Sequence, residues 1–263
     1  MTHQLYIVDS FTDRLFRGNP AAVCILGEDL PDSVLQSIAA ENNLSETAFF
    51  SPTQERPSLR WFTPKSEIDL CGHATLAAGF VALEFLRPKD TCIEFQTMSG
   101  SLAVTKNGAE YTIDLPLRNP QAVAPPAGLF EALGIREAET LFARDYVVVL
   151  RSEQEVHDIS PRLEILRQLD GVGVVVTAPG DTADFVSRAF FPKIGIDEDP
   201  VTGSTHCALA PYWGKKLGKR ELSARQLSHR GGELRCSLRE DRVFLTGSAR
   251  LYMRGEISHL NPR

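Results

Sequence analysis

The chain has 263 residues, a formal net charge of −6 and a pI near 5.6. This acidic balance disfavours binding to phosphate backbones, so nucleic acid is not an expected partner. No apolar run approaches the roughly 20 residues that cross a bilayer, and no basic start followed by an apolar stretch marks export. We therefore expect a cytoplasmic protein without a membrane partner, long enough for two modest domains.

The cysteines indicate neither a disulfide framework nor a zinc site, because they are odd in number, widely spaced and free of any C-x-x-C pair: Cys24, Cys71, Cys92, Cys207 and Cys236. His73, His206 and Cys207 share no recognised ligand spacing with a carboxylate. Gly171-Val172-Gly173 lacks the third glycine and the following helix of a dinucleotide fingerprint. We expect no bound metal and no cofactor.

Short β-like runs dominate the first half, at residues 5–8, 22–26, 47–50, 59–62, 92–96, 102–106 and 111–115. Pro31-Asp32 opens an amphipathic helix that extends to about Asn42. Gly72-His73 opens a second helix, rich in alanine and apolar, that extends to about Leu86. The second helix is apolar all round, which predicts burial on all sides.

A proline- and alanine-rich stretch from Pro116 to Gly128 lacks periodic pattern, which is typical of an interdomain connection. We therefore predict a first domain over residues 1–117 and a second over 118–248. The segment 249–263, strand-like from Ala249 to Ile257, is a candidate to return to the first domain. In the second half, strands are predicted near residues 146–150, 172–177, 184–190, 234–237 and 242–246, with a helix over 204–217.

The two halves resemble each other in sequence. The segment from Phe62 to Asp69 matches the segment from Phe190 to Asp197 at its Phe, Pro, Lys, Ile and Asp positions. Shortly afterwards Cys71-Gly72-His73 falls opposite Thr202-Gly203-Ser204, and both segments continue into the predicted helices. A chance recurrence is the alternative, but the shared context favours duplication. We expect an α+β fold of two pseudo-repeated domains, each a curled, mainly antiparallel sheet around a central helix, with a binding cleft between them.

In each half a glycine stands at the start of a predicted buried helix. Free backbone N–H groups and the positive end of the helix dipole favour an anion there, such as a carboxylate or an enolate formed during reaction. Ordinary capping by Thr202, Ser204 or Thr205 is the alternative for the second helix.

Five spaced blocks resemble the signature of the phenazine-biosynthesis-isomerase-like family and occur in family order: Gly18-Asn19-Pro20-Ala21-Ala22-Val23, Asn43-Leu44-Ser45-Glu46-Thr47-Ala48-Phe49, Phe62-Thr63-Pro64, Cys71-Gly72-His73-Ala74-Thr75 and Asp199-Pro200-Val201-Thr202-Gly203-Ser204. The resemblance covers essentially the whole chain. It implies two domains of the diaminopimelate-epimerase type, a homodimer and no cofactor. The family's type reaction shifts a double bond in a dihydro-hydroxyanthranilate.

By residue-to-residue match, the resemblance implies that Glu46 is the catalytic glutamate and that His73 and Asp199 are the other polar groups of the active site. It implies that the substrate pocket is lined by four further residues: Ser45, Gly72, Gly203 and Ser204. The predicted function is an isomerase that moves a proton between carbons of a small, anionic substrate, with Glu46 as general acid and base.

Read without the family, Glu46 opens an apolar strand, where its carboxylate is partly withdrawn from water. The helix N-terminus at His73 disfavours the protonated imidazole. Asp199 precedes a proline and is therefore biased toward an extended backbone, which can aim its carboxylate into a cleft. The alternatives are a solvated surface glutamate, a structural histidine cap and a turn aspartate.

Two other functions remain open at this point. In a two-base epimerase or racemase, paired thiols act on opposite faces of a substrate, and Cys71 fits one such position. Its counterpart in the second half is Thr202, whose hydroxyl is too weak an acid for this role, and Cys207 is predicted to face the core. A small-molecule-binding protein that has lost catalysis is the second alternative, because fold does not determine function.

Overall fold

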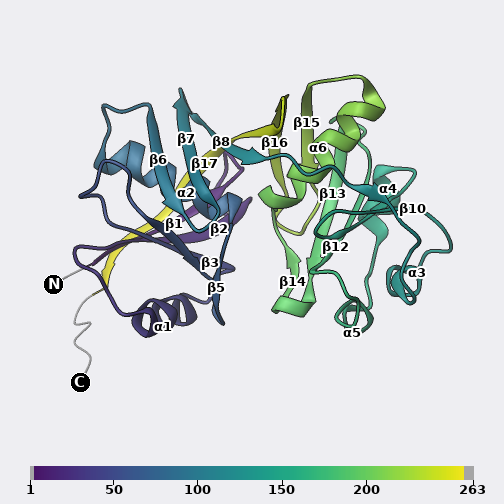
Figure 1. The fold of residues 1–263 in the computed structure, drawn as a ribbon, viewed down its shortest axis with the longest axis horizontal. Coiled ribbons are helices and arrows are strands. Elements are labelled where there is room, and N and C mark those ends of the chain that lie inside the picture. Colours follow the sequence, from purple (N-terminus) through teal and green to yellow (C-terminus); the bar gives the residue numbers. More distant parts are fainter. Residues whose placement is uncertain (1–2, 258–263) are drawn as a thin grey trace. The chain divides into compact units, whose positions relative to one another are not determined.

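The computed structural model describes residues 3–257 and divides them into two compact units (Figure 1). The first unit holds the described residues up to Leu115 together with those from Thr246 onward, and the second holds Pro116–Leu245. The predicted domain ranges also included residues 1–2 and 258–263, which lie outside the described residues.

The first unit is built on one curled sheet. Its strands are β1 (His3–Ser10), β2 (Asn19–Ile25), β3 (Glu46–Phe50), β4 (Leu59–Phe62), β5 (Glu67–Ile68), β6 (Cys92–Thr97), β7 (Gly100–Asn107), β8 (Glu110–Pro116) and most of β17 (Arg242–Ile257). Only β2 and β3 run parallel among the pairs β1–β17, β1–β2, β2–β3, β3–β4, β4–β5, β6–β7 and β7–β8. A bridge between Ser58 and Gln96 ties the entry to β4 to strand β6, so the sheet curls back on itself.

Helix α2 (Gly72–Val81) lies inside this curl and continues as a π-helical segment, Ala82–Leu86. All ten residues of α2 are buried, as its apolar sequence predicts. Close packing requires glycine at position 79, because a Cβ there would come within 2.3 Å of the Val104 side chain on β7. Helix α1 (Asp32–Asn42) instead buries one face, through Leu35, Ile38 and Ala39.

The second unit has the same kind of sheet and central helix. Its strands are β9 (Gln121–Ala122), β10 (Glu139–Phe142), β11 (Tyr146–Val149), β12 (Val174–Pro179), β13 (Phe185–Phe191), β14 (Ile196–Asp199), β15 (Glu221–Gln226) and β16 (Gly232–Arg239). Helix α6 (Gly203–Leu217) is the long helix, and its Trp213 indole N–H donates to Thr177 Oγ1 on β12 at 2.9 Å.

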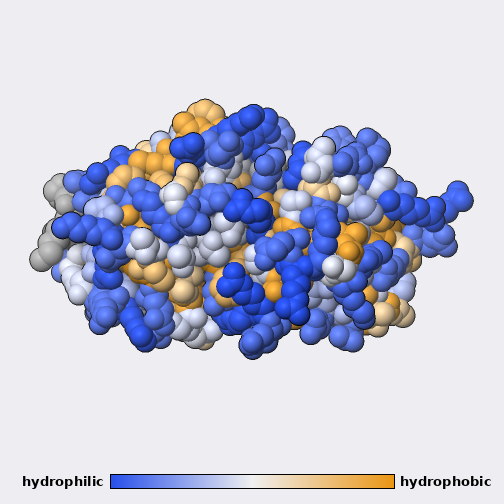
Figure 2. All heavy atoms as spheres, turned by 90° about the horizontal axis from the view of Figure 1, so that it is seen from above, coloured by the Kyte–Doolittle hydropathy of each residue, from blue (hydrophilic) through white to orange (hydrophobic). Residues whose placement is uncertain are grey.

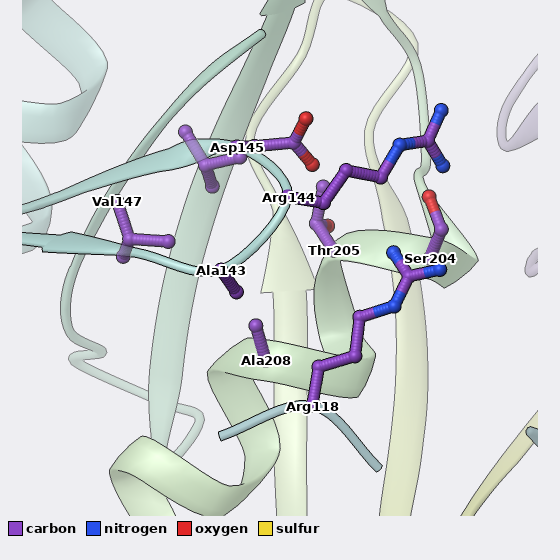
Figure 3. A pocket seen from close by; sticks show the side chains of 9 residues that line it. Arg118, Ala143, Arg144, Asp145, Val147, Ser204, Thr205 and Ala208 are labelled. Atoms are coloured by element: carbon purple, nitrogen blue, oxygen red, sulfur yellow. The ribbon is translucent and has the colours of Figure 1, made fainter. Parts of the chain in front are cut away.

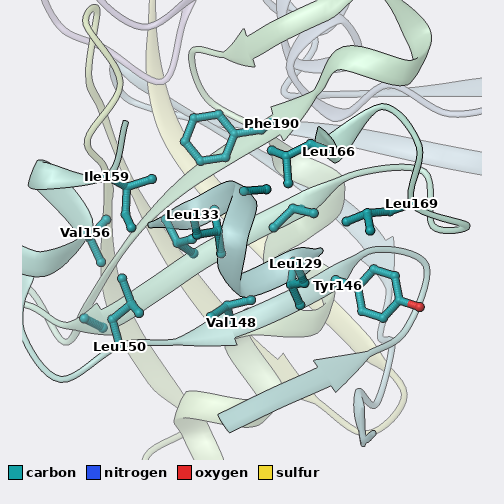
Figure 4. Close-up of a cluster of buried hydrophobic side chains, with 14 of the residues drawn as sticks. Leu129, Leu133, Tyr146, Val148, Leu150, Val156, Ile159, Leu166, Leu169 and Phe190 are labelled. Atoms are coloured by element: carbon teal, nitrogen blue, oxygen red, sulfur yellow. The ribbon is translucent and has the colours of Figure 1, made fainter. Parts of the chain in front are cut away.

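Short helices add a separate apolar layer to the second unit (Figure 4). They are α3 (Leu129–Leu133), α4 (Glu153–Asp158) and α5 (Leu163–Leu166), and a 3-10 turn follows at Pro192–Ile194. Leu133 and Leu166 from two of these helices belong to one buried cluster with Val148 and Phe190 of the sheet. These helices were not predicted, because four to six residues are too few to display a helical period.

Strand pairing shows that the two units repeat one design. β10–β11, β11–β12, β12–β13 and β13–β14 are antiparallel, parallel, antiparallel and antiparallel, as are β1–β2 to β4–β5. Thr47 pairs with Phe62, and Val174 pairs with Phe190. Aligning the two phenylalanines makes Val174 the counterpart of Thr47, and so makes Gly173 the counterpart of Glu46.

An arginine device also recurs at matching positions. Arg60 forms a two-pronged pair with Glu67, and Arg188 forms one with Glu198. Each guanidinium carbon lies 5.1 Å from the ring centroid of the phenylalanine two residues later in its strand. The likeness of the two halves therefore extends from sequence to strand register and to side-chain contacts.

One expectation about the strands needs correction. The segments 242–246 and 249–257 were read as two strands, but they form the single 16-residue strand β17. Gly247, between the two predicted segments, is part of this strand. Residues 249–257 pair with β1, so this part of the chain does return to the first unit.

Polar and charged residues cover most of the face drawn in Figure 2, and apolar residues are scattered among them. The large apolar side chains that are most exposed are Phe16, Met98 and Tyr252, and Phe16 contacts Tyr252 edge to face. Among the described residues, no helix is both long enough and apolar enough to cross a bilayer.

Candidate active site

Glu46 is the first residue of β3, a strand that is buried along its whole length. Helix α1 ends just before it at Asn43, whose left-handed backbone (φ 48°) turns the chain back toward the sheet. The parallel neighbour β2 places Ala21 opposite Glu46. The carboxylate is thus held at the start of a core strand, with only 8% of its side chain exposed.

His73, the second residue of α2, faces that carboxylate. Its Nε2 lies 3.2 Å from Glu46 Oε2, and 4% of its side chain is exposed. Burial lowers the pKa of His73 to about 3, because the low-dielectric interior disfavours the charged imidazolium. His73 is therefore neutral at physiological pH.

The contacts of the ring define which nitrogen carries the proton. Asn19 Nδ2, at the start of β2, lies 3.1 Å from His73 Nδ1. An amide nitrogen only donates, so Nδ1 accepts and the proton of the neutral ring is on Nε2. Ser45 Oγ donates to Asn19 Oδ1 at 3.3 Å, which agrees with this orientation of the amide. Ser10 Oγ donates to the carbonyl of His73 at 2.9 Å and anchors the helix start.

The proton on Nε2 is close to Glu46 but is not locked to it. Within the described residues, His73 Nε2 has no hydrogen bond of good geometry, although the 3.2 Å contact places it against the carboxylate. A buried donor in this state is costly unless a ligand satisfies it. The arrangement can therefore donate a hydrogen bond to a substrate atom next to Glu46.

Cys71 completes the cluster, with its Sγ 3.5 Å from His73 Nδ1. One ligand-type atom each from Glu46, Cys71 and His73 lie within 4.8 Å of one another, which raises the question of a metal ion. The imidazole stands between the other two groups, however, with Nδ1 toward the thiol and Nε2 toward the carboxylate. One ion could not take all three ligands unless the ring turned, so the contacts fit proton transfer better than metal ligation.

The start of α2 also carries the backbone donors predicted for an anion. Gly72 is its first residue, and Cys71 at the N-cap has an extended backbone and makes no side-chain cap. Thr75 closes the first turn, since its N–H and its hydroxyl both donate to the Cys71 carbonyl. Gly72 and His73 thus lie where a helix N-terminus leaves N–H groups without helical partners.

The other predicted residues form a second cluster, at the start of α6 in the second unit. Asp199 ends β14, and its carboxylate accepts a hydrogen bond from Thr202 Oγ1. Gln226 joins them, because its Nε2 donates to the Asp199 carbonyl at 2.7 Å and its Oε1 accepts from the Thr202 N–H at 2.8 Å. Gly203 and the half-buried Ser204 follow as the first two helical residues.

Capping by the hydroxyls, the alternative weighed for this helix, is not what the threonine at its start does. Thr202 occupies the N-cap of α6 without a side-chain cap, and its hydroxyl is instead directed to Asp199. Thr205 Oγ1 donates back to the Thr202 carbonyl at 2.9 Å. Cys207, as predicted, is fully buried, and burial raises its pKa to about 12.

Of the predicted residues, the first unit brings Glu46 and His73 into contact, with Gly72 beside them and Ser45 linked through Asn19. Asp199, Gly203 and Ser204 belong to the second unit. Sequence reasoning missed two polar partners, Asn19 and Gln226. Asn19 stood in the quoted Gly18-Asn19-Pro20 block, whereas nothing in the local sequence marked Gln226.

Known proteins share the sequence and the fold of this chain. Residues 8–255 match the family model described as "Phenazine biosynthesis-like protein". An uncharacterized isomerase of Pseudomonas aeruginosa is 49% identical over 96% of this chain and 98% of its own length.

Two solved structures describe the fold. A PhzF-family protein of Enterococcus faecalis superposes with a TM-score of 0.94 at 49% identity, covering 98% of this chain and 99% of that one. A probable proline racemase of Agrobacterium radiobacter superposes with a TM-score of 0.69 at 11% identity, covering 99% and 94%. The second likeness concerns the fold alone and identifies the epimerase-type architecture that the sequence predicted.

Proposed function

Since this chain belongs to the phenazine biosynthesis-like family and is an isomerase, we propose that it moves one proton between two carbons of a small anionic substrate, with Glu46 as acid and base. The observation that carries the proposal is the buried contact of 3.2 Å between Glu46 and the neutral His73. A carboxylate beside an uncharged imidazole keeps its negative charge available for a substrate proton.

The proposed reaction balances without an oxidant or reductant. The Glu46 carboxylate takes a proton from a carbon next to a double bond, and the electron pair of the broken C–H bond forms a new double bond. The electron pair of the old double bond then forms a new C–H bond at the carbon of that bond that lies farther from the deprotonated carbon. Glu46 supplies the proton for this bond. The double bond has moved, and Glu46 is a carboxylate again, so no cofactor is required.

His73 supports this step in two ways. Its Nε2–H can donate to a substrate oxygen or to Glu46, while Asn19 holds Nδ1 and so preserves the tautomer. The first N–H groups of α2, at Gly72 and His73, are suited to a carboxylate or to the negative charge that develops during the reaction. That Asp199, Gly203, Ser204 and Ser45 contact the same substrate is carried over from the family resemblance.

A two-base epimerase is less well supported. Cys71 lies close to an imidazole, as a catalytic thiol would. Its counterpart, Thr202, directs its hydroxyl to Asp199 and offers no second thiol. We expect Cys71→Ser to retain activity within about tenfold, whereas a loss as large as that of a Glu46 variant would favour thiol chemistry.

The test is deuterium incorporation from D2O into a panel of small cyclic and amino-substituted carboxylic acids, followed by NMR. Wild-type protein should exchange a carbon-bound proton of at least one acid, and Glu46→Gln should lower that rate by about 100-fold or more. Glu41→Gln, an exposed change on α1 in the same unit, is the matched control. Exchange that persists in Glu46→Gln would remove Glu46 from the mechanism, and a tight binder without exchange would favour a binding protein.

The homodimer and the cytoplasmic location implied at the sequence level remain proposals. Light scattering at several protein concentrations tests the first, because a dimer should have twice the 29.0 kDa mass of the chain.

A further inference from the structure

A small hollow opens within the second unit, at the N-terminus of the 15-residue helix α6 (Figure 3). The space that a water-sized group can occupy in it is about 10 Å³, and the total rises to about 230 Å³ only when open solvent at its mouth is included. Its polar lining comes from Arg118, Arg144, Asp145, Ser204 and Thr205. A space of this size suits a small ion or one polar group of a ligand better than a large cofactor.

The repeat explains why the second unit is hollow here. In the first unit the β1–β2 hairpin continues through the pair Ser10–Asn19, and both residues contact His73 at the start of α2. The matching β10–β11 hairpin ends three pairs earlier, at Phe142–Tyr146. The catalytic pair, Glu46 and His73, also has different counterparts in the second unit. Gly173 takes the place of Glu46, and Ser204 takes the place of His73. The shorter hairpin and the small Ser204 leave space at the start of α6, whereas Gly173 itself is tightly packed against Phe191.

The charges around the hollow are unusual. Neither the Arg118 nor the Arg144 guanidinium hydrogen-bonds or ion-pairs with another residue in the described part of the chain, and both are half-buried. Figure 3 shows both side chains extending to the side where Ser204 lies. Two cations beside the positive end of a helix repel each other, and the single carboxylate of nearby Asp145 offsets only part of that repulsion, so a bound anion would stabilise the arrangement.

Asp145 supplies a second, independent sign of a ligand. Only 5% of this residue is exposed, and its carboxylate accepts the Gly173 backbone N–H. Its Oδ1 is buried without a hydrogen-bond partner among residues 3–257. Burial raises the pKa of Asp145, and the nearby Arg144 and Arg118 oppose that rise. A buried acceptor without a partner is costly, so a donor from a bound molecule would stabilise it.

We propose that this hollow, the arginine pocket (Arg118, Arg144, Asp145 and Ser204), binds a small molecule that carries both an oxyanion and a hydrogen-bond donor. The guanidinium groups, the Ser204 hydroxyl and the first N–H groups of α6 bind the oxyanion. Asp145 Oδ1 accepts from the donor. A phosphate that retains a proton and a hydroxy-carboxylate share this chemistry. The proposal does not depend on the proton transfer assigned to Glu46, although it shares Ser204 with the substrate pocket that the family resemblance implies.

Two matched pairs of probes test the requirement for a donor, measured by titration calorimetry at constant ionic strength. Phosphate and sulfate have the same shape, but only phosphate retains an O–H at neutral pH. Lactate and acetate are both carboxylates, but only lactate adds a hydroxyl. We expect the member with the donor to bind at least about tenfold more tightly in one pair, and that pair identifies the phosphate or the carboxylate source. Equal affinities within both pairs, or no binding in either, would overturn the proposal.

Substitutions test whether the preferred probe binds in the arginine pocket. Arg144→Gln and Arg118→Gln should each weaken the preferred probe by about tenfold, the loss of one charge-assisted hydrogen bond. Lys216→Gln, in the last turn of the same helix, removes an equal charge elsewhere and should leave affinity unchanged. If the arginine variants bind as well as wild type, the site is elsewhere and the proposal is wrong.

Asp145→Asn keeps an acceptor for the Gly173 N–H and provides a test that does not require loss of a basic residue. It removes a negative charge from the pocket, so sulfate affinity should rise about tenfold and the preference for phosphate over sulfate should shrink. An unchanged sulfate affinity in a variant that melts like wild type would contradict the assigned role of Asp145.

Discussion

The two units use the same frame for different purposes. In the first, the long β1–β2 hairpin brings Asn19 and Ser10 to His73, and β3 begins with Glu46, so the start of the central helix is surrounded by polar side chains. In the second, the equivalent hairpin is short, and glycine and serine replace the glutamate and the histidine. The two units therefore keep the same strand pairing and the same arginine device. They differ in the side chains at the start of one core strand and at the start of the central helix.

The largest expected effect comes from substitutions at the second residue of each central helix, which is His73 in α2 and Ser204 in α6. His73→Ser places in the first unit the residue that the second unit has, and should lower proton-exchange activity by about 100-fold, because the neutral Nε2 donor disappears. Ser204→Ala should cost only a few-fold. Deuterium incorporation measures both, and equal losses would show that the two positions contribute alike.

Gly173, the counterpart of Glu46, should not tolerate a side chain. A Cβ there would lie 2.2 Å from the Phe191 ring and 2.8 Å from the Phe190 carbonyl oxygen, so Gly173→Ala should lower the free energy of unfolding by about 2 to 3 kcal/mol. Gly27→Ala is the control, since nothing lies within 4 Å of its Cβ. Urea unfolding measures both, and a neutral Gly173→Ala would contradict the tight packing.

Both central helices carry a buried histidine, and His206 on α6 allows a pH test outside the catalytic pair. Burial lowers the pKa of His206 to about 4 from the usual 6.5, partly opposed by its bond to the Thr202 carbonyl. As the pH falls, His206 therefore becomes protonated at a higher pH in the unfolded chain than in the folded one. The corresponding stability is complete above pH 6.5 and is lost as pH falls toward 4.

Between pH 7 and pH 5 the part of this loss that is due to His206 should amount to about 2 kcal/mol, and His206→Gln should remove that part while the part due to His73 stays. Urea unfolding at both pH values gives the difference, with the exposed His229→Gln as control. The same pH dependence in His206→Gln and wild type would mean that His206 is not held neutral by burial.

The smallest effect concerns the repeated arginine device. Arg188 has 14% of its side chain exposed and donates to three backbone carbonyls besides Glu198, whereas Arg60 has 31% exposed and adds only an exposed pair with Asp32. Arg188→Lys should therefore cost about 1 kcal/mol more in unfolding free energy than Arg60→Lys. Equal costs would show that the carbonyl contacts contribute little.

Local pattern predicted the long elements well. The apolar helix at Gly72, the helix at Gly203 and most core strands follow from period and end signals, and the Phe62 and Phe190 segments indicated the repeat. The short helices α3 to α5 and the continuity of β17 were missed, because a few residues carry no period and a glycine can remain extended inside a ladder.

By itself, the sequence determined the class of fold, the likeness of the two halves and the identity of Glu46 and His73 as candidates, since these depend on local pattern and on spaced motifs. Tertiary structure decided which groups meet. Asn19 reaches His73 across 54 residues because β2 lies against α2, and this contact selects the tautomer that faces Glu46. The arginine pocket likewise depends on the β10–β11 hairpin ending three pairs before its counterpart β1–β2. No single segment of the sequence displays this difference in hairpin length.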